Sequence, residues 1–302
     1  TYQLRDDAEL DQILRLDFKE HLRDGTLLLA LDGSAKANAR SLGAVLDDFF
    51  QSRERAAADK QDIGGVNLQK VLVGMLASTL RRHAGHGAFD ELEQRLGQSV
   101  VLANDGNCFA LSEACDGAGA DYSLVFGMTL GTGCGGGIAL NRQIFPGASG
   151  IAAECGHITL PGYQERKDGP PERCYCGKYN CAESFISGSG LSGRYRLMTQ
   201  ETLSCQAIIA RAQKGERAAC EQVLRFRQQL ARTLATIINV IDPGVIVLGG
   251  GLSNVPLLVN DLQAEVAPLV FTDHFITPIV PAQHGDSSGM RGAAWLAARS
   301  GV

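Results

Sequence analysis

The chain has 302 residues, of which 45% are hydrophobic and 20% are charged, proportions typical of a globular protein with a large buried core. The formal net charge of -5 argues against a nucleic-acid partner, because phosphate backbones are bound by basic surfaces. No apolar run approaches the ~20 residues that a membrane-spanning helix needs. The first residues are acidic and polar, unlike a secretory signal. We therefore expect a cytoplasmic protein that binds neither a membrane nor a nucleic acid.

The nine cysteines divide into a scattered set and a cluster. An odd number argues against a fully paired disulfide framework and favours a reducing compartment. The scattered ones lie among apolar or small residues, where cysteine usually acts as a small buried hydrophobe: Cys108, Cys115, Cys134, Cys155, Cys205 and Cys220. The remaining three lie close together in a polar segment and indicate one metal site.

The first third of the chain has few strong patterns. Residues 10–22 and 42–50 are expected to be helical, residues 100–103 form an apolar run typical of a buried strand, and residues 108–115 are expected to be helical. Asp105 therefore lies at a strand-to-helix junction, where α/β proteins place ligands. An Asx turn or an N-cap of the following helix is the structural alternative for this aspartate.

Two glycine-rich segments follow predicted strands. Residues 131–137 follow the strand expected over 123–130, and residues 249–251 follow the apolar strand 245–248. Glycine lets backbone N–H groups approach a phosphate closely, and Thr132 adds a hydroxyl donor. A tight hairpin or a bulge is the alternative for each segment taken alone. Together they favour a nucleotide site with these contacts: Gly131, Thr132, Gly133, Gly249, Gly250 and Gly251.

The other predicted elements alternate between helices and strands. A turn at 141–143 leads to a short strand, and a long amphipathic helix is expected over 220–240. Residues 257–270 are expected to be helical, residues 276–280 to form a strand, and residues 289–299 to form a closing helix. The pattern predicts an α/β fold.

Residues 161–183 are rich in proline, glycine, cysteine and charge, and need a bound group to order them. They carry Cys174, Cys176 and Cys181, and His157 lies shortly before them. One imidazole and three thiolates form a set that zinc takes in a closed, tetrahedral structural site. The ion would offset the entropy of ordering such a loop. Ordinary buried or free thiols are the alternative.

Carboxylates near these ligands are candidates for sugar contacts, because paired acceptors suit vicinal hydroxyls. Glu154 and Glu183 each lie within three residues of a proposed zinc ligand, although solvated surface charge is the simpler explanation for either alone. Phosphoryl transfer from ATP needs a base for the attacking hydroxyl, and Asp105 fits that role. The proposed sugar contacts are Asn104, Glu154, His157 and Glu183.

These motifs resemble the ROK family of bacterial sugar kinases and regulators. The resemblance rests first on the run Ala153-Glu154-Cys155-Gly156-His157. It rests equally on the box Cys174-Tyr175-Cys176-Gly177-Lys178-Tyr179-Asn180-Cys181-Ala182-Glu183. Segments 102–107, 245–251 and 284–294 are also similar to the family, so the resemblance covers about residues 88–302. Its details look closest to the fructokinases (manno-fructokinases), with the N-acetylglucosamine kinases next.

The resemblance implies a two-lobed α/β fold of the actin-like ATPase (ribonuclease H-like) type with an interdomain cleft. The small lobe would hold residues 1–118 and a closing helix at 290–302, and the large lobe would hold residues 119–289. It implies that a hexose is phosphorylated by ATP with Mg²⁺, fructose giving fructose 6-phosphate, with N-acetylglucosamine or glucose as the alternative. Asp105 would be the general base, the Cys/His set would bind Zn²⁺, and the protein would be a homodimer.

Residues 1–87 depart from the family pattern. The family's Asp-x-Gly-Gly-Thr phosphate hairpin has only a late near match at residues 62–67, and its Gly-x-Pro-Gly sugar loop is absent. Asn180 also replaces the family's glycine, a mild change because asparagine tolerates a left-handed backbone. Three hypotheses remain: an active hexose kinase, a sugar-binding pseudokinase that cannot cradle ATP, and a ROK transcriptional regulator. The acidic net charge disfavours the regulator.

Overall fold

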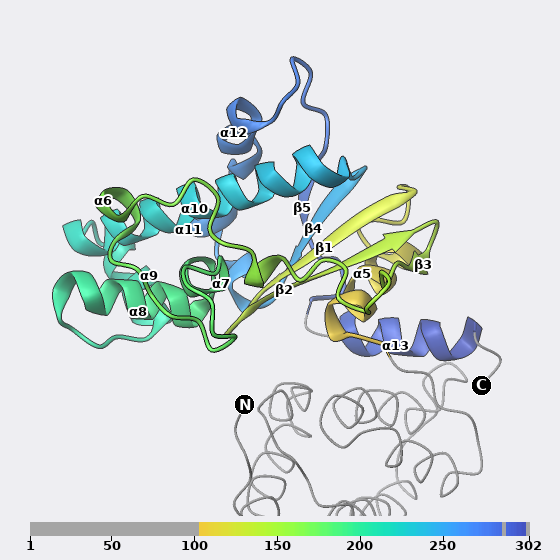
Figure 1. Ribbon diagram of the computed structural model, residues 1–302, viewed down its shortest axis with the longest axis horizontal. Coiled ribbons are helices and arrows are strands. Elements are labelled where there is room, and N and C mark those ends of the chain that lie inside the picture. The colour runs from red at the N-terminus through yellow and green to blue at the C-terminus, as the bar shows by residue number, and fades with distance from the viewer. Residues whose placement is uncertain (1–102, 286–287, 300–302) are drawn as a thin grey trace, which may run out of the picture. The chain divides into compact units, whose positions relative to one another are not determined.

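The computed structural model describes residues 103–285 and 288–299 (Figure 1). The chain divides into two compact units, Gly106–Gly292 and a second unit that combines Thr1–Asp105 with Ala293–Val302. The lobe boundaries predicted from the sequence stay a proposal. Four predicted segments lie outside the described residues: 10–22, 42–50, 62–67 and 100–102.

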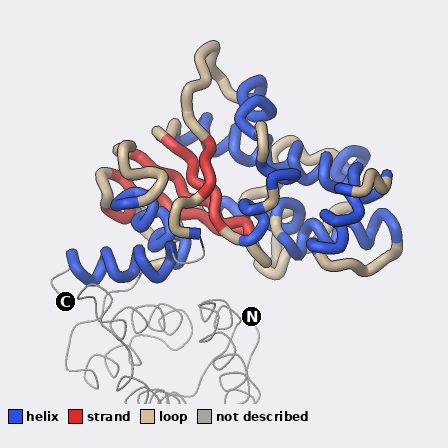
Figure 2. Tube along the Cα trace, turned by 180° about the vertical axis from the view of Figure 1, so that it is seen from behind, coloured by secondary structure: helices blue, strands red, loops and turns tan. Residues whose placement is uncertain are grey.

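One five-stranded sheet, in the order β3-β2-β1-β4-β5, forms the centre of the Gly106–Gly292 unit (Figures 1 and 2). Strands β1 (Leu124–Leu130) and β2 (Cys134–Leu140) are antiparallel. Strand β4 (Val245–Gly249) runs parallel to β1 on its other side. Beyond these three lie β3 (Gln143–Ile144), antiparallel to β2, and β5 (Ile279–Pro281), parallel to β4.

The two faces of the sheet carry different apolar side chains, because strand residues alternate between faces. On one face Val125 and Val247 pack with Phe109 of helix α5 (Asp105–Asp116). The opposite face contributes Phe126, Met128, Leu130, Ile138, Ile246 and Leu248 to a larger core. Both faces of β1 and β4 are therefore covered, which explains why these strands are continuous apolar runs.

Helix α10 (Arg217–Ile241) confirms the long amphipathic helix expected over 220–240. Its buried face repeats every four residues at Phe226, Leu230, Leu234 and Ile238. This spacing places one apolar stripe along the helix. The stripe enters the larger core together with side chains from α7 (Glu183–Ile186), α8 (Gly188–Thr199) and α9 (Cys205–Gln213).

The helix expected over 257–270 is divided into three short pieces. These are α11 (Pro256–Val259), α12 (Leu262–Val266) and the 3-10 turn η5 (Ala267–Leu269). Asp261 has a φ of 57°, which ends helical geometry between the first two pieces. Apolar periodicity alone did not reveal this break.

The other predicted elements need smaller adjustments. The closing helix is confirmed as α13 (Ser288–Arg299), and the short strand after 141–143 is β3. The strand expected over 276–280 begins later, at Ile279, because Pro278 has no N–H to donate to a ladder. Among the described helices, none combines the length and apolarity that a bilayer crossing requires.

Candidate functional site

The two predicted glycine segments lie side by side, because they follow neighbouring parallel strands. Thr129 near the end of β1 is paired with Gly249 at the end of β4. Gly250 has a φ of 81°, and a Cβ there would lie 2.6 Å from Leu130 O. Gly251 then begins the 3-10 turn η4 (Gly251–Asn254). Both segments thus leave the carboxyl edge of the parallel strands, where α/β sheets bind ligands.

Residues 135–137 belong to strand β2, which corrects the expectation of a loop over 131–137. Close packing on the two faces of β2 explains Gly136 and Gly137. A Cβ at Gly136 would lie 2.6 Å from Ala153 O, and a Cβ at Gly137 would lie 2.0 Å from Gly106 O. The tight hairpin weighed as an alternative is therefore present, and only residues 131–133 form its turn.

This turn between β1 and β2 is fixed by the start of α8. Gly188 N donates to Gly131 O at 2.7 Å, and Ser189 Oγ donates to Thr132 O at 2.8 Å. In a trans peptide, the carbonyl and the following N–H point in opposite directions. The N–H groups of Thr132 and Gly133 therefore point away from α8, and neither meets a hydrogen-bond partner among the described residues. Successive N–H groups of this kind form an anion-binding concavity.

Glu183, the first residue of α7, faces the same turn. Its Oε2 accepts a hydrogen bond from Cys134 N at 2.9 Å. A Cβ at Gly133 would lie 2.6 Å from that oxygen, so glycine is needed for the carboxylate to approach. The proposed sugar contact Glu183 thus lies between the metal-loop cysteine Cys181 and the glycine turn.

Glu154 and His157 belong to a turn that packs on the start of β2. His157 ends the 3-10 turn η3 (Cys155–His157), and its N–H donates to Glu154 O at 3.2 Å. A Cβ at Gly156 would lie 2.1 Å from Cys134 O. The glycine of the Glu-x-Gly-His motif therefore allows this turn to approach the start of β2, directly after the 131–133 turn.

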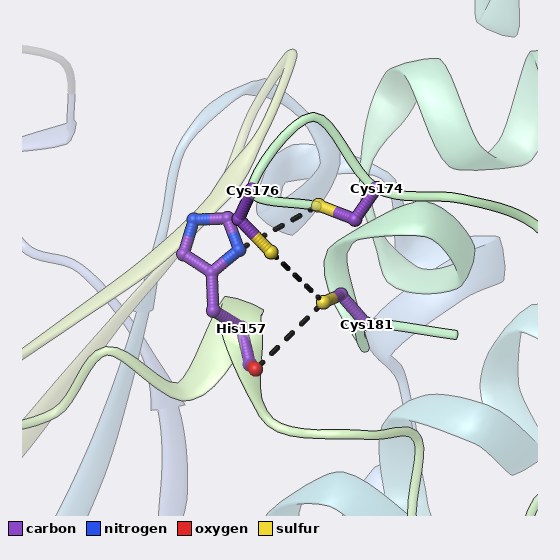
Figure 3. A group of neighbouring side chains, drawn as sticks. All are labelled: His157, Cys174, Cys176 and Cys181. Atoms are coloured by element: carbon purple, nitrogen blue, oxygen red, sulfur yellow. Dashed lines mark hydrogen bonds between the residues drawn. The ribbon is translucent and has the colours of Figure 1, made fainter. Parts of the chain in front are cut away.

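Four metal-type ligands converge from this turn and the following loop, as Figure 3 shows: His157, Cys174, Cys176 and Cys181. Their ligand atoms all lie within 4.8 Å of one another. Cys174 Sγ lies 3.7 Å from His157 Nδ1, and Cys176 Sγ lies 3.5 Å from Cys181 Sγ. A tetrahedral zinc with ordinary bond lengths places its ligand atoms about 3.6–3.8 Å apart. The donor set therefore fits one such ion.

Local turns shape the cysteine loop. Gly177 N donates to Cys174 O at 2.9 Å, and Cys174 N donates to Lys178 O at 2.8 Å. Asn180 has a φ of 57°, and its Oδ1 accepts a hydrogen bond from Glu172 N at 2.9 Å. The left-handed backbone allowed for asparagine at this position is the one that it adopts.

Two of the three clustered thiols are held in the neutral form by their surroundings. Burial, with the neighbouring Cys176 and Cys174 thiols, raises the pKa of Cys181 to about 12. Burial also raises the pKa of Cys174, whereas a hydrogen bond from the Lys178 N–H lowers the pKa of Cys176. The protein alone therefore does not stabilise three thiolates, and a coordinated dication would do so by its charge.

The His157 ring is oriented by a second contact. Its Nδ1 faces the thiols in Figure 3, and its Nε2 lies 2.9 Å from the Tyr175 hydroxyl. The two rings meet edge to face with centroids 5.1 Å apart. A hydrogen bond at the ring nitrogen remote from a metal fixes the tautomer of a ligating histidine. With Nδ1 directed at the thiols, Nε2 carries the N–H of the ring, and this atom meets the Tyr175 hydroxyl.

Helix α6 (Glu165–Asp168) fastens the beginning of the loop to α10. Asp168 is 4% exposed and pairs with Arg232, while Gln229 Nε2 donates to its Oδ1 at 3.1 Å. Burial acts to raise the pKa of Asp168. Hydrogen bonds from Arg232, Gln164 N and Gln229 outweigh burial and hold that pKa below its ordinary value.

Asp105 is the exposed first residue of α5, and Asn104 precedes it. Both residues are assigned to the unit that contains the N-terminal segment, whereas Gly106 begins the larger unit. The predicted helix after Asp105 is confirmed. The structure thus groups the candidate metal ligands, Glu154, Glu183 and the glycine segments within one unit.

Three polar groups near the site were not identified from the sequence: Cys134 N, Tyr175 and Ser189. Cys134 acts through its backbone, which side-chain chemistry does not reveal. Ser189 follows Ser187, the N-cap of α8. A Ser-Gly-Ser-Gly run before a helix is a recognisable capping signal, but it does not identify the distant partner of the second serine.

Comparison with known proteins places this geometry in a family. The ROK family model matches residues 76–300. The N-acetyl-D-glucosamine kinase of Pasteurella multocida (strain Pm70) is 42% identical over 210 residues, 68% of this chain and 69% of that protein. The N-acetyl-D-glucosamine kinase of Escherichia coli O6:H1 (strain CFT073) is 40% identical over 209 residues, with the same coverage of 68% and 69%.

A solved structure supports the same assignment. A ROK family glucokinase from Streptomyces griseus, in complex with glucose and AMPPNP, matches with a TM-score of 0.60 and 28% identity, over 72% of this chain and 73% of that one. The α/β fold of the actin-like ATPase type predicted from the sequence is confirmed. The chain belongs to the ROK family.

Proposed function

We propose that this protein transfers the γ-phosphoryl group of ATP to N-acetylglucosamine. The chain is an ATP-dependent sugar kinase of the ROK family. One observation of the structure carries the proposal: an outward-facing pair of N–H groups, at Thr132 and Gly133, lies beside the Glu183 carboxylate. Two N–H donors that can bind a phosphate, next to a carboxylate that can accept a hydrogen bond from a hydroxyl, suit phosphoryl transfer to an alcohol.

The choice of sugar rests on the relatives. The details of the sequence favoured fructose as the substrate, with N-acetylglucosamine and glucose as alternatives. The 42% identical kinase from Pasteurella multocida is named for N-acetyl-D-glucosamine, so similarity favours that alternative. Glucose is the second candidate, because the matched Streptomyces griseus enzyme holds glucose.

Each site residue then has a role. The Thr132 and Gly133 N–H groups of the 131–133 turn receive the ATP phosphates, and the 249–251 segment contacts the adenosine. Mg²⁺, when bound, neutralises phosphate charge. Asn104, Glu154, His157 and Glu183 bind sugar hydroxyls. Asp105 accepts the proton of the attacking hydroxyl.

Zinc would have a structural role. His157, Cys174, Cys176 and Cys181 would hold the ion with no position left for water, as in closed structural sites. The ion would order the loop that positions Glu183 and the His157 ring. We also propose that the protein is cytoplasmic and forms a homodimer. Light scattering of the purified protein tests the dimer.

Specificity constants for a panel of sugars test the substrate assignment. Purified full-length protein is assayed for ADP release with N-acetylglucosamine, glucose, fructose and N-acetylmannosamine. We expect the highest kcat/KM for N-acetylglucosamine. A higher value for fructose or glucose would reject this sugar but keep the kinase assignment, whereas no release with any sugar would reject both.

A further inference from the structure

Ser189 makes a long-range contact that helix capping does not require. Ser187 already caps α8, since its Oγ accepts a hydrogen bond from Gly190 N at 3.0 Å. Ser189 Oγ also lies 3.0 Å from Ser187 Oγ. Its hydroxyl donates to Thr132 O at 2.8 Å, and its N–H reaches the same oxygen at 3.2 Å. Both Ser189 and Thr132 are exposed, so water could satisfy these groups. The need to satisfy buried polar groups therefore does not explain this contact, and we expect it to orient the peptide that carries Thr132 O.

The contact fixes the orientation of the Thr132–Gly133 peptide. A peptide in a turn can rotate as a unit when the residue after it is glycine, because glycine tolerates both signs of φ. Rotation would turn the Gly133 N–H toward α8 and present Thr132 O to an incoming anion. Two donors from Ser189 on one carbonyl oppose this rotation. The longer N–H contact alone would remain if the hydroxyl were lost.

We infer that Ser189 is a positioning residue of the nucleotide site. Its hydroxyl holds the Thr132 carbonyl toward α8, so that the Gly133 N–H stays directed at the ATP phosphates. The Glu183 carboxylate supports the next peptide in the same way, through Cys134 N at 2.9 Å. This inference rests on the proposed function of the 131–133 turn as a phosphate-binding turn.

Nucleotide binding by Ser189→Ala tests the inference. Calorimetry with the non-hydrolysable analogue AMPPNP, in the absence of sugar, gives a readout independent of turnover. A net intramolecular hydrogen bond corresponds to a change of about two- to tenfold in an equilibrium constant. We expect Kd for AMPPNP and KM for ATP to rise by that factor. KM for N-acetylglucosamine and the thermal midpoint should stay at the parental values.

Two variants sharpen the test. Ser189→Thr keeps the hydroxyl and should restore the parental Kd. Ser192→Ala is the matched control, because its hydroxyl lies on the same helix and pairs with Cys205 Sγ at 3.3 Å; it should leave nucleotide affinity unchanged.

Two outcomes would overturn the role of Ser189. One is an unchanged Kd in Ser189→Ala. The other is a joint loss of nucleotide affinity, sugar affinity and thermal midpoint, which would indicate a general structural role. A parent protein that binds no AMPPNP would instead contradict the proposed function itself.

Discussion

The side chain of Glu183 accepts a hydrogen bond from the backbone N–H of Cys134 at 2.9 Å. Cys134 begins β2 directly after the glycine turn, and Glu183 begins α7 shortly after the metal-loop residue Cys181. This bond connects the loop that carries the candidate metal ligands with the turn that we propose binds phosphate. Order in the metal loop is therefore expected to influence both parts of the site.

Metal removal tests this connection. We predict one zinc per chain by elemental analysis, and we predict that Cys176→Ala loses the ion. The free energy of unfolding should fall by more than about 2 kcal/mol, as when a metal site is lost. Sugar affinity should fall as well, because Glu183 and His157 are positioned by the same loop. Cys220→Ala is the control, since Cys220 is exposed and lies outside the cluster. Less than half an equivalent of zinc in the undamaged parent would contradict the assignment.

Asp105→Asn tests the catalytic base. The amide keeps the size and most of the hydrogen bonding of the carboxylate but cannot accept the hydroxyl proton. We expect kcat to fall by a factor on the order of 10²–10⁴, while sugar affinity and zinc content stay near parental values. Asp121→Asn, at an exposed turn residue before β1, should have no effect. Turnover of Asp105→Asn near the parental rate would exclude Asp105 as the base.

Gly137→Ala tests the packing of α5 on β2. The added Cβ would lie 2.0 Å from Gly106 O in the first turn of α5, so one backbone has to shift. We expect a loss of about 1–3 kcal/mol in the free energy of unfolding, as in other overpacked cores. Gly135→Ala is the matched control, because its Cβ would be 3.3 Å from the nearest atom, Thr129 Oγ1. Equal stability of the two variants in denaturant titrations would contradict this packing argument.

Acid titration tests the anchor of the loop at Asp168. Its pKa in the folded protein lies below the ordinary value, with Arg232 among its hydrogen-bond donors. A depressed pKa contributes stability above the unfolded value of about 3.9, and this stability is lost as pH falls through the folded pKa. The stability difference between the parent and Asp168→Asn should therefore be largest near neutral pH and shrink below about pH 4. A difference that is constant across this range would show that the ionised carboxylate is not the anchor.

Elements with strong local patterns could be predicted from the sequence, and long-range contacts could not. The repeat of buried residues along α10 and the apolar runs of β1 and β4 follow directly from periodicity. The convergence of the candidate metal ligands was also predictable, because three of them lie within one short loop. By contrast, the Glu183–Cys134 bond joins residues 49 apart in sequence, and the Ser189–Thr132 bond joins residues 57 apart.

The glycines of β2 illustrate the same limit. Glycine permits the close approach of any backbone group, so a glycine run does not distinguish a phosphate from a neighbouring peptide. Gly136 and Gly137 accommodate Ala153 O and Gly106 O, whereas the turn at 131–133 leaves the Thr132 and Gly133 N–H groups without a partner among the described residues. Only the three-dimensional contacts separate these two uses of the same residue type.

The most direct measurement of the central claim is the identity of the product. Full-length protein is incubated with ATP, Mg²⁺ and N-acetylglucosamine, and the products are analysed by mass spectrometry alongside a reaction without sugar. We predict N-acetylglucosamine carrying one phosphoryl group, formed in equal amount with ADP. Protein that binds N-acetylglucosamine in calorimetry yet forms no sugar phosphate from it or from any other hexose would contradict the kinase assignment and support a sugar-binding pseudokinase.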